Sequence, residues 1–433
     1  MKSNTSIFLF ILLLSTAYSA VAQKWEASTS WTGVATYEDE ATQITIHIKK
    51  VQQGWKASLT LDNIGVSGWP SIKTSVESDS LLLIFPSDSG PQEMKLTRNG
   101  NSLQGIWSDT RFIQDAVVKL ELLDKVDSTL EERMLVQGSA GNIGFSIIRP
   151  TSQIVRQYVV LTHGSGPTPR DVNRFTAQRF AEHGIASVIY DKRGVGESEG
   201  NLYTSSFDDL AEDAVKVANY IAANLEDSSI GFWGHSQGGW IATRAATLFS
   251  KPAFVITSAG PMVSPAREGE WDFVDKIKDR VDAKKLVPLV REIVRAWHDG
   301  VRSDNWTQFN RLVESQKNKD WFEASGLNSL SSSPDSNFIA YYKLHMDHDP
   351  LPIVNKLQVP ILAIYSLEDE SIDSRESIDI IDSTLNGDLD IRLIIYKGLD
   401  HTMRRLAAGI PLRFPEHPRD YFSAQAAFIQ SLN

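Results

Sequence analysis

Gly234-His235-Ser236-Gln237-Gly238 has the G-x-S-x-G form, in which a sharp turn between a strand and a helix holds a serine hydroxyl out as a nucleophile. The apolar run 230–233 comes directly before this pentapeptide, and apolar residues recur at helical spacing over 239–248. Glycine suits both ends of the turn because a side chain there would crowd the flanking backbone. A chance match in a glycine-containing loop is the alternative, and the strand-turn-helix context argues against it.

A nucleophilic serine needs a histidine to take its proton and a carboxylate to orient that histidine, and in this arrangement the acid precedes the histidine in the chain. The apolar run 359–365 is typical of a buried strand, and it leads into the carboxylate-rich loop Ser366-Leu367-Glu368-Asp369-Glu370. From its position in the motif we interpret Asp369 as the orienting acid. Glu368 competes for this role, and a solvated acidic loop is the ordinary alternative.

The histidine partner is expected on the loop after the next strand. Residues 391–396 read as that strand and end in Gly398-Leu399-Asp400-His401. His345 and His348 form an H-x-x-H pair, but they lack the glutamate base or third histidine of the usual zinc patterns. Of the nine histidines, only His401 follows the predicted nucleophile and acid and lies at a strand end. We therefore predict His401 as the general base and predict no metal.

The tetrahedral oxyanion formed by serine attack needs two N–H donors, one from the residue after the nucleophile and one from a loop after an earlier strand. The first donor is Gln237. The stretch His163-Gly164-Ser165-Gly166-Pro167 follows the apolar run 158–161, and its glycines allow close approach of the backbone to a substrate. We assign the second donor to the N–H of Ser165, with an ordinary Gly/Pro turn as the alternative.

The run Ile189-Tyr190-Asp191-Lys192-Arg193-Gly194-Val195-Gly196-Glu197-Ser198, with HGSGP before it and GHSQGG after it, completes a set of three ordered motifs. Together they resemble the bacterial α/β-hydrolases described as serine aminopeptidase-like, many of which behave as carboxylesterases. The resemblance covers about residues 130–433. Within the run, we interpret residues 191–193 as scaffold, with Arg193 pairing a carboxylate to hold the loop beside the nucleophile.

The resemblance implies an α/β-hydrolase fold and acyl transfer to water without a cofactor. Carried over to this chain, it implies a triad of Ser236, Asp369 and His401, with Ser165 and Gln237 as oxyanion donors. The sequence departs from the family pattern at Ser366, because the acid loop often begins with glycine.

Residues 1–22 have the pattern of a secretory signal peptide. Lys2 precedes the apolar run 7–14, and Ala20-Val21-Ala22 forms a small-x-small cleavage site. We predict cleavage after Ala22 and a periplasmic or secreted protein. An N-terminal anchor is the alternative, although the run is too short for a membrane span. The chain has no cysteine, so any exported form lacks disulfides and a lipoprotein attachment site.

Residues 23–125 predict a small all-β domain, because short runs of β-formers alternate with Gly, Asn, Asp and Ser turns. Trp31-Thr32-Gly33 and Gly105-Ile106-Trp107 resemble the lipocalin-like β-module found ahead of some hydrolases of this group. Its tryptophans are interpreted as core, since burial is the commoner fate of large aromatics, with sugar or lipid binding as the alternative.

Residues 126–433 predict an α/β-hydrolase domain with a helical cap inserted at about 262–350. The capped helix over 207–225 is structural, since Ser206 and Asp209 fit a capping pair. Residues 262–350 are helical and rich in tryptophan, with no obvious strand. The cap aromatics, including Tyr341 and Tyr342, either line an acyl pocket or form the core of the cap itself.

The formal net charge is −11, and removal of Lys2 with the signal peptide makes it −12. Nucleic acid is an improbable partner, because phosphate neutralisation needs a basic face. The expected substrate is a small-molecule ester or a short peptide.

Three functions are compatible with these motifs. The first is an exported carboxylesterase acting on short or medium acyl esters. The second is a serine peptidase that releases N-terminal residues, and it needs a cap carboxylate for the substrate amine. The candidates for that carboxylate are Glu268, Glu270, Asp272 and Asp347. The third is a binding protein with an inactive hydrolase domain, against which the ordered serine, aspartate and histidine argue.

Overall fold

The computed structural model describes residues 25–38, 40–61, 66–86, 90–109, 114–123, 129–151, 154–225, 227–332, 337–383, 385, 387–405 and 416–432. The predicted signal peptide, residues 1–22, lies outside this part. None of the helices described there is both long and apolar enough to cross a membrane. The chain divides into two compact units, one built from residues up to Thr60 with Gly68–Asp124, and the other from Leu61–Ser67 and from Lys125 onward.

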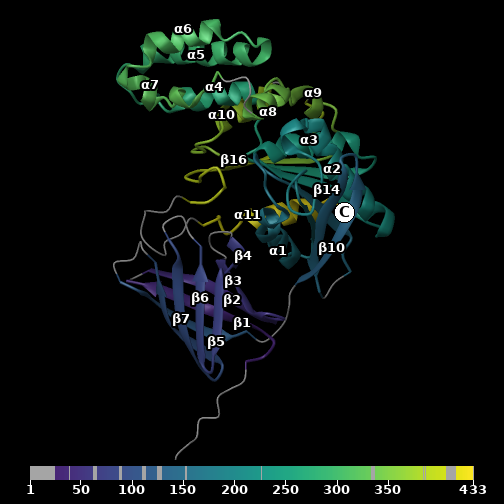
Figure 1. The fold of residues 1–433 in the computed structure, drawn as a ribbon. Helices are drawn as coiled ribbons and strands as arrows, with labels where there is room; N and C mark the ends of the chain where they lie inside the picture. The colour runs from purple at the N-terminus through teal and green to yellow at the C-terminus, as the bar shows by residue number, and fades with distance from the viewer. Residues whose placement is uncertain are drawn as a thin grey trace, which may run out of the picture. The chain divides into compact units, whose positions relative to one another are not determined.

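The first unit is built on one sheet whose described strands follow the order β4-β3-β2-β1-β9-β8-β7-β6-β5 (Figure 1). Neighbours such as β1 and β2, or β8 and β9, run antiparallel. The strands are β1 Ser28–Tyr37, β2 Glu40–Val51, β3 Gly54–Leu61, β4 Val66–Pro70, β5 Lys73–Glu77, β6 Ser80–Phe85, β7 Gln92–Asn99, β8 Ser102–Ser108 and β9 Ala116–Leu122.

The tryptophans of the two terminal motifs in this unit belong to its core. The side chains of Trp31 and Trp107 are fully buried. Each indole N–H has an internal acceptor, since Trp31 donates to Thr29 Oγ1 at 3.0 Å and Trp107 to Gln92 Oε1 at 3.2 Å. A buried indole N–H needs such an acceptor, and both have one. The two rings are therefore core residues, as predicted from the sequence.

The second unit contains a mixed sheet with the strand order β10-β11-β13-β12-β14-β15-β16-β17. Strands β10 and β11 form an antiparallel hairpin, β11 pairs antiparallel with β13, and the remaining neighbours are parallel. The strands are β10 Thr129–Gly138, β11 Gly141–Pro150, β12 Gln157–Thr162, β13 Ala186–Tyr190, β14 Ser229–His235, β15 Pro252–Ser258, β16 Ile361–Ser366 and β17 Ile391–Tyr396.

Helices cover both faces of this sheet. Residues of α2 and α3 pack on one face, and residues of α1 and α11 pack on the other. These helices, with α10 after β16, are α1 Arg174–Glu182, α2 Phe207–Asn224, α3 Gln237–Leu248, α10 Ser374–Ser383 and α11 Tyr421–Gln430. An α/β domain thus follows an all-β domain, which confirms the predicted fold class.

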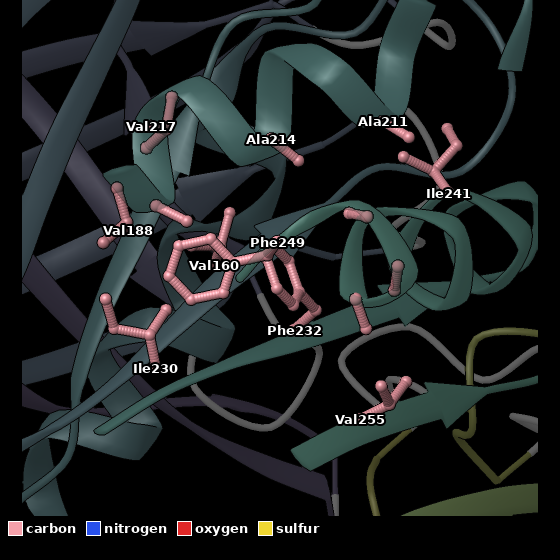
Figure 2. Packing of buried hydrophobic residues seen from close by; sticks show 14 of the residues in the cluster. Val160, Val188, Ala211, Ala214, Val217, Ile230, Phe232, Ile241, Phe249 and Val255 are labelled. Atoms are coloured by element: carbon pink, nitrogen blue, oxygen red, sulfur yellow. The ribbon is translucent and has the colours of Figure 1, made fainter. Parts of the chain in front are cut away.

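Alternating side chains along the central strands supply the two cores, as the twofold periodicity of a strand requires. In β12, Val160 faces α2 and α3, whereas Val159 and Leu161 face α1 and α11. Phe232 of β14 belongs to the first core and lies beside Val160 and Phe249 in Figure 2. Both faces of the strands are therefore apolar, and this explains the continuous apolar runs in the sequence.

Between β15 and β16, in the interval where the sequence predicts a cap, the described residues form six α-helices, which Figure 1 labels α4 to α9. They are α4 Pro265–Asp275, α5 Ala283–Ser303, α6 Thr307–Gln316, α7 Asp320–Ala324, α8 Asn337–His345 and α9 Leu351–Val354. Trp297 and Trp321 are buried in an apolar cluster of these helices, so part of the tryptophan content forms their own core.

The hairpin β10–β11 has no counterpart among the strands predicted from sequence. β10 alternates between half-buried and exposed residues and lies at the end of the sheet, so it lacks an apolar run. An edge strand with one solvated face gives a weaker sequence signal than the fully buried β12.

Replacing Ile241 with alanine is expected to destabilise the α/β unit by about 2–5 kcal/mol, because it opens a cavity between α3 and the sheet. Ile241 is 1% exposed and lies among the core residues of Figure 2. Leu248, on the same helix and 40% exposed, supplies the matched control, and its replacement is expected to change stability by about 0.5 kcal/mol or less. Urea unfolding measures both, and equal losses would contradict this packing.

Candidate active site

Ser236 lies in a strained turn between β14 and α3. Its backbone has φ 54° and ψ −127°, a conformation that side-chain-bearing residues rarely adopt. A Cβ on Gly234 would lie 2.0 Å from the carbonyl oxygen of Gly238, and one on Gly238 would lie 2.8 Å from the carbonyl oxygen of Thr162. Both glycines are therefore required sterically, and the pentapeptide has the strand-turn-helix context predicted for it.

Asp369 and His401 meet on loops that follow two adjacent parallel strands, β16 and β17. His401 Nδ1 lies 2.9 Å from Oδ2 and 3.0 Å from Oδ1 of Asp369. The backbone N–H groups of Ser371 and Ile372 donate to Oδ1 at 2.8 and 3.1 Å. The fully buried carboxylate is thus held facing the imidazole.

Glu368, the competing acid, is directed elsewhere. Its Oε2 accepts a hydrogen bond from the N–H of Gly398 at 2.6 Å. Glu370 accepts from the backbone N–H of His401 at 3.1 Å. Of the three acidic residues in this loop, Asp369 is therefore the one whose carboxylate contacts the imidazole.

Ser366, where the sequence departs from the glycine common in the family, links the two loops. Its hydroxyl is buried at the end of β16 and donates to the carbonyl of Leu399 at 2.7 Å. The same oxygen accepts from the N–H of Leu399 at 3.3 Å. This serine, which from the sequence was only a departure from the family pattern, therefore joins the loop of Asp369 to the loop of His401.

The imidazole of His401 lies close to the nucleophile turn. Its ring centroid is 4.8 Å from that of His235, the residue directly before Ser236. Because Nδ1 faces the carboxylate, the proton of a neutral imidazole belongs on Nδ1, which leaves the lone pair on Nε2. This is the tautomer that a general base uses.

Both predicted oxyanion residues lie beside Ser236. Ser165 and Gln237 line one cavity together with Ser236. A Cβ added at Gly164 would lie 3.7 Å from Cβ of Ser236, an ordinary contact distance, so this turn is a direct neighbour of Ser236. Gln237 begins α3, where the first N–H groups of a helix lack intrahelical partners. The structure therefore brings the loop of the predicted oxyanion donor Ser165 to Ser236.

The cavity in front of Ser236 has a volume of about 460 Å³, and five of its lining residues are Phe, Tyr or Trp. Phe338, Tyr341 and Tyr342 come from α8 of the inserted helices, and Phe207 and Trp240 come from α2 and α3. Both cap tyrosines thus line the pocket, and Tyr342 also packs against Trp297 in the core of the insertion, to which Trp321 belongs as well.

The family model described as serine aminopeptidase, S33, matches residues 153–405, more than half of the chain. The chain belongs to this family. Among curated proteins it is similar to the polyketide transferase claH of Penicillium crustosum, with 29% identity over 39% of this chain and 51% of that protein. It is also similar to the mitochondrial palmitoyl-protein thioesterase ABHD10 of Rattus norvegicus, with 26% identity over 52% of this chain and 61% of that protein. The chain thus spans less than two thirds of the length of either relative.

Solved structures with a similar fold include an esterase from Pyrococcus furiosus, with 14% identity and a TM-score of 0.45 over 72% of this chain and 95% of that chain. A thermophilic esterase from Thermogutta terrifontis aligns over 70% of this chain and 99% of its own, with 17% identity and a TM-score of 0.41.

Two of the four cap carboxylates considered for an amine site are already paired with arginines. Arg295 Nε lies 2.8 Å from Oε2 of Glu270, and Arg302 Nη2 lies 2.6 Å from Oδ1 of Asp347. Neither lines the cavity in front of Ser236. In this member of the S33 family, Glu270 therefore forms an ion pair between α4 and α5, and Asp347 forms one at the surface.

Glu268 and Asp272 do line the cavity. Asp272 pairs with Lys276 at 2.6 Å, one turn further along the chain. The carboxylate of Glu268 makes no hydrogen bond or ion pair with any described residue. Desolvation, with a smaller contribution from the charge of Asp369, raises the pKa of Glu268 to about 8. Of these four candidate carboxylates, Glu268 is thus the one that lines the cavity with Ser236 and has no ion-pair partner among the described residues.

The loop that follows β13 is held by buried ion pairs. Arg193 Nε lies 2.5 Å from Oδ2 of Asp213 in α2, and Arg170 Nη2 lies 2.8 Å from Oδ2 of Asp191. All four side chains are at most 6% exposed. The predicted structural role of Arg193 therefore has a specific partner. Lys192, predicted to belong to the same scaffold, instead donates to oxygens of Gly164, Gly166 and Gln237.

The histidines of the H-x-x-H pair contribute to packing. The rings of His345 and His348 lie 4.1 and 5.0 Å from the ring of Phe207. In the described part of the chain, no cluster of three or more His, Cys, Asp or Glu side chains has the geometry to hold a metal ion.

Replacing Asp213 with asparagine is expected to destabilise the protein by about 3–5 kcal/mol, because it leaves the buried guanidinium of Arg193 without its main counter-charge. Asp208 lies on the same helix and pairs with Arg244 at the surface, where it is 59% exposed. Its replacement with asparagine is expected to cost about 1 kcal/mol or less. Urea unfolding of the two variants measures the difference, and similar losses would refute a structural role for the buried pair.

Proposed function

We propose that this chain is an exported serine hydrolase that cleaves carboxylic esters of short or medium acyl chains through an acyl-enzyme on Ser236. The main support for this proposal is that the buried carboxylate of Asp369 faces Nδ1 of His401 and that Ser236, close to this pair, lies in a strained turn. Membership of the S33 family and the similarity to a thioesterase support hydrolysis of an acyl compound. Export rests on the composition of residues 1–22.

In the proposed mechanism, Ser236 Oγ attacks the acyl carbon while His401 Nε2 accepts its proton. Asp369 keeps the imidazole in the required tautomer and stabilises the imidazolium that forms. The N–H groups of Ser165 and Gln237 stabilise the oxyanion. His401 then protonates the leaving alcohol, and water, activated by the same imidazole, releases the acid.

The aromatic cavity supports an acyl group as the bound moiety. Its volume of about 460 Å³ is within the range typical of small-ligand sites, and its aromatic lining favours an apolar chain. The inserted helices supply three of the aromatic side chains, so selectivity for the acyl group is proposed to depend on α8.

Serine aminopeptidase activity is the second candidate function, and it is favoured by Glu268. The carboxyl group of Glu268 lines the same cavity as Ser236 and, once ionised, would bind the ammonium group of a substrate. If this is the function, aminoacyl-p-nitroanilides are hydrolysed and Glu268→Gln raises their KM more than that of neutral esters.

The full chain is expected to hydrolyse a p-nitrophenyl ester series from acetate to laurate, while aminoacyl-p-nitroanilides remain uncleaved. Ser236→Ala is expected to reduce kcat by about 10⁴-fold or more, because loss of the nucleophile removes most of the catalysis. Ser165→Ala is the matched control and is expected to stay within tenfold, since its proposed role uses the backbone N–H. Anilide turnover would replace esterase with peptidase, and silence toward both would favour a binding protein.

Asp369→Asn is expected to lower kcat by about 10⁴-fold, because an amide favours the wrong imidazole tautomer. Glu368→Gln is expected to keep activity within a few-fold, since its carboxylate accepts from the N–H of Gly398 and not from His401. Steady-state kinetics on one p-nitrophenyl ester compare the two variants. A greater loss for Glu368→Gln would reverse the assignment of the acid.

A further inference from the structure

Lys192 carries an ammonium group that is buried against neutral acceptors. The residue is 2% exposed and follows β13 directly after Asp191. Its Nζ donates to the carbonyl oxygen of Gly164, to that of Gly166 at 3.0 Å and to Oε1 of Gln237 at 3.2 Å. No carboxylate among the described residues lies within ion-pair distance of it. The three N–H bonds of the ammonium thus match three oxygen acceptors.

The bond to Gly164 constrains the predicted oxyanion donor directly. The carbonyl of Gly164 and the N–H of Ser165 belong to one peptide group, and the described chain contains no cis peptide bond. In a planar trans peptide group the C=O and N–H point in opposite directions. Anchoring the Gly164 oxygen on Lys192 therefore turns the N–H of Ser165 away from the ammonium.

The same bond strengthens the donor. A cation on a carbonyl oxygen polarises the peptide group, and polarised hydrogen-bond chains are stronger in a low-dielectric interior. The N–H of Ser165 thereby becomes a better donor to a developing negative charge. The second bond, to the oxygen of Gly166, holds the turn on the other side of Ser165, where Pro167 supplies no N–H.

Lys192 also contacts the second predicted donor residue. The side-chain oxygen of Gln237 accepts from Lys192, and its Nε2 donates to Tyr341 Oη at 3.2 Å. Tyr341 belongs to α8, one of the inserted helices that line the cavity. One ammonium is therefore connected to both sides of the predicted oxyanion site and, through Gln237, to the insertion.

We propose that Lys192 is a positioning residue of the oxyanion site, which aims and polarises the N–H of Ser165 while fixing Gln237 at the start of α3. Lys192 does not line the cavity, so it acts through these residues and not on the substrate. The proposal rests on the proposed function, because the oxyanion is formed by attack of Ser236.

A purely structural role explains less of the arrangement. Burial lowers the pKa of Lys192 to about 7, so the site disfavours the charge that it holds. The nearby imidazoles are not competing cations, because burial lowers the pKa of His163, to about 3, and of His345, which favours their neutral forms. A methionine would fill similar space without this cost, whereas an ammonium satisfies both glycine carbonyls and Gln237.

The test compares Lys192→Met and Lys192→Arg with the wild-type full chain, and Lys216→Met, on the exposed face of α2, controls for the substitution itself. We expect Lys192→Met to lower kcat for a p-nitrophenyl ester by about 10²-fold, comparable to loss of one oxyanion donor, with KM within threefold. Affinity for a trifluoromethyl ketone, which forms a tetrahedral adduct, should fall in parallel, while affinity for the matching methyl ketone should not. Lys192→Arg should recover part of kcat.

Hydrogen exchange of the peptide that contains Gly164, Ser165 and Gly166 supplies a readout that does not need turnover. Exchange of these amides is expected to be at least about tenfold faster in Lys192→Met, with the melting temperature used to recognise global unfolding. If the wild type fails to hydrolyse esters, the proposed function fails, and unchanged exchange would separately overturn the anchoring by Lys192.

Two results overturn the proposal when esters are hydrolysed. One is a folded Lys192→Met protein whose kcat and trifluoromethyl ketone affinity stay within threefold of the wild type. The other is a loss of activity that follows the melting temperature while the ratio of the two ketone affinities is unchanged, since this marks Lys192 as structural only. If Lys192→Met does not fold, the ketone ratio of Lys192→Arg decides in the same way.

Discussion

The backbone turn at Ser236 is the constraint on which the rest of the site depends. A positive φ at a residue with a side chain is costly, and here it persists because β14 and α3 hold both ends of the turn. Gly234 and Gly238 have no room for a Cβ, so the strand and helix approach each other as closely as their backbones allow. The result is a serine raised above the carboxyl ends of the parallel strands, where the other loops converge.

These loops are joined to one another by buried polar contacts. Ser366 fastens the acid loop to the histidine loop, and Asp369 orients His401 across the same junction. Arg193 anchors the loop after β13 to α2, and Lys192 extends from that loop to the glycine turn after β12. Each contact spans two chain segments that are distant in sequence. The side chains predicted to act in catalysis are therefore held in position by buried polar groups whose hydrogen bonds and ion pairs are formed within the protein.

The sequence predicted the fold where a pattern was local. The pentapeptide lies between an apolar strand and a helix whose apolar residues recur at helical spacing, and the apolar runs 158–161 and 391–396 lie within β12 and β17, so motif and periodicity agree. The hairpin β10–β11 was missed because β10 is an edge strand with a solvated face, and because Gly144 and Ser146 interrupt the apolar residues of the buried β11. The partners of Ser366 and Lys192 were missed for another reason, since they depend on contacts between loops. Likewise, sequence alone left four cap carboxylates equivalent, and only spatial placement separates Glu268 from Glu270 and Asp347.

Ser236 is proposed to be the residue that becomes acylated. Treating the full chain with a fluorophosphonate, digesting it and locating the adduct by peptide mass spectrometry tests this directly. A single modification is expected on the peptide that contains Ser236, and none in Ser236→Ala. An adduct on another residue, or an unlabelled protein that still hydrolyses esters, would contradict it.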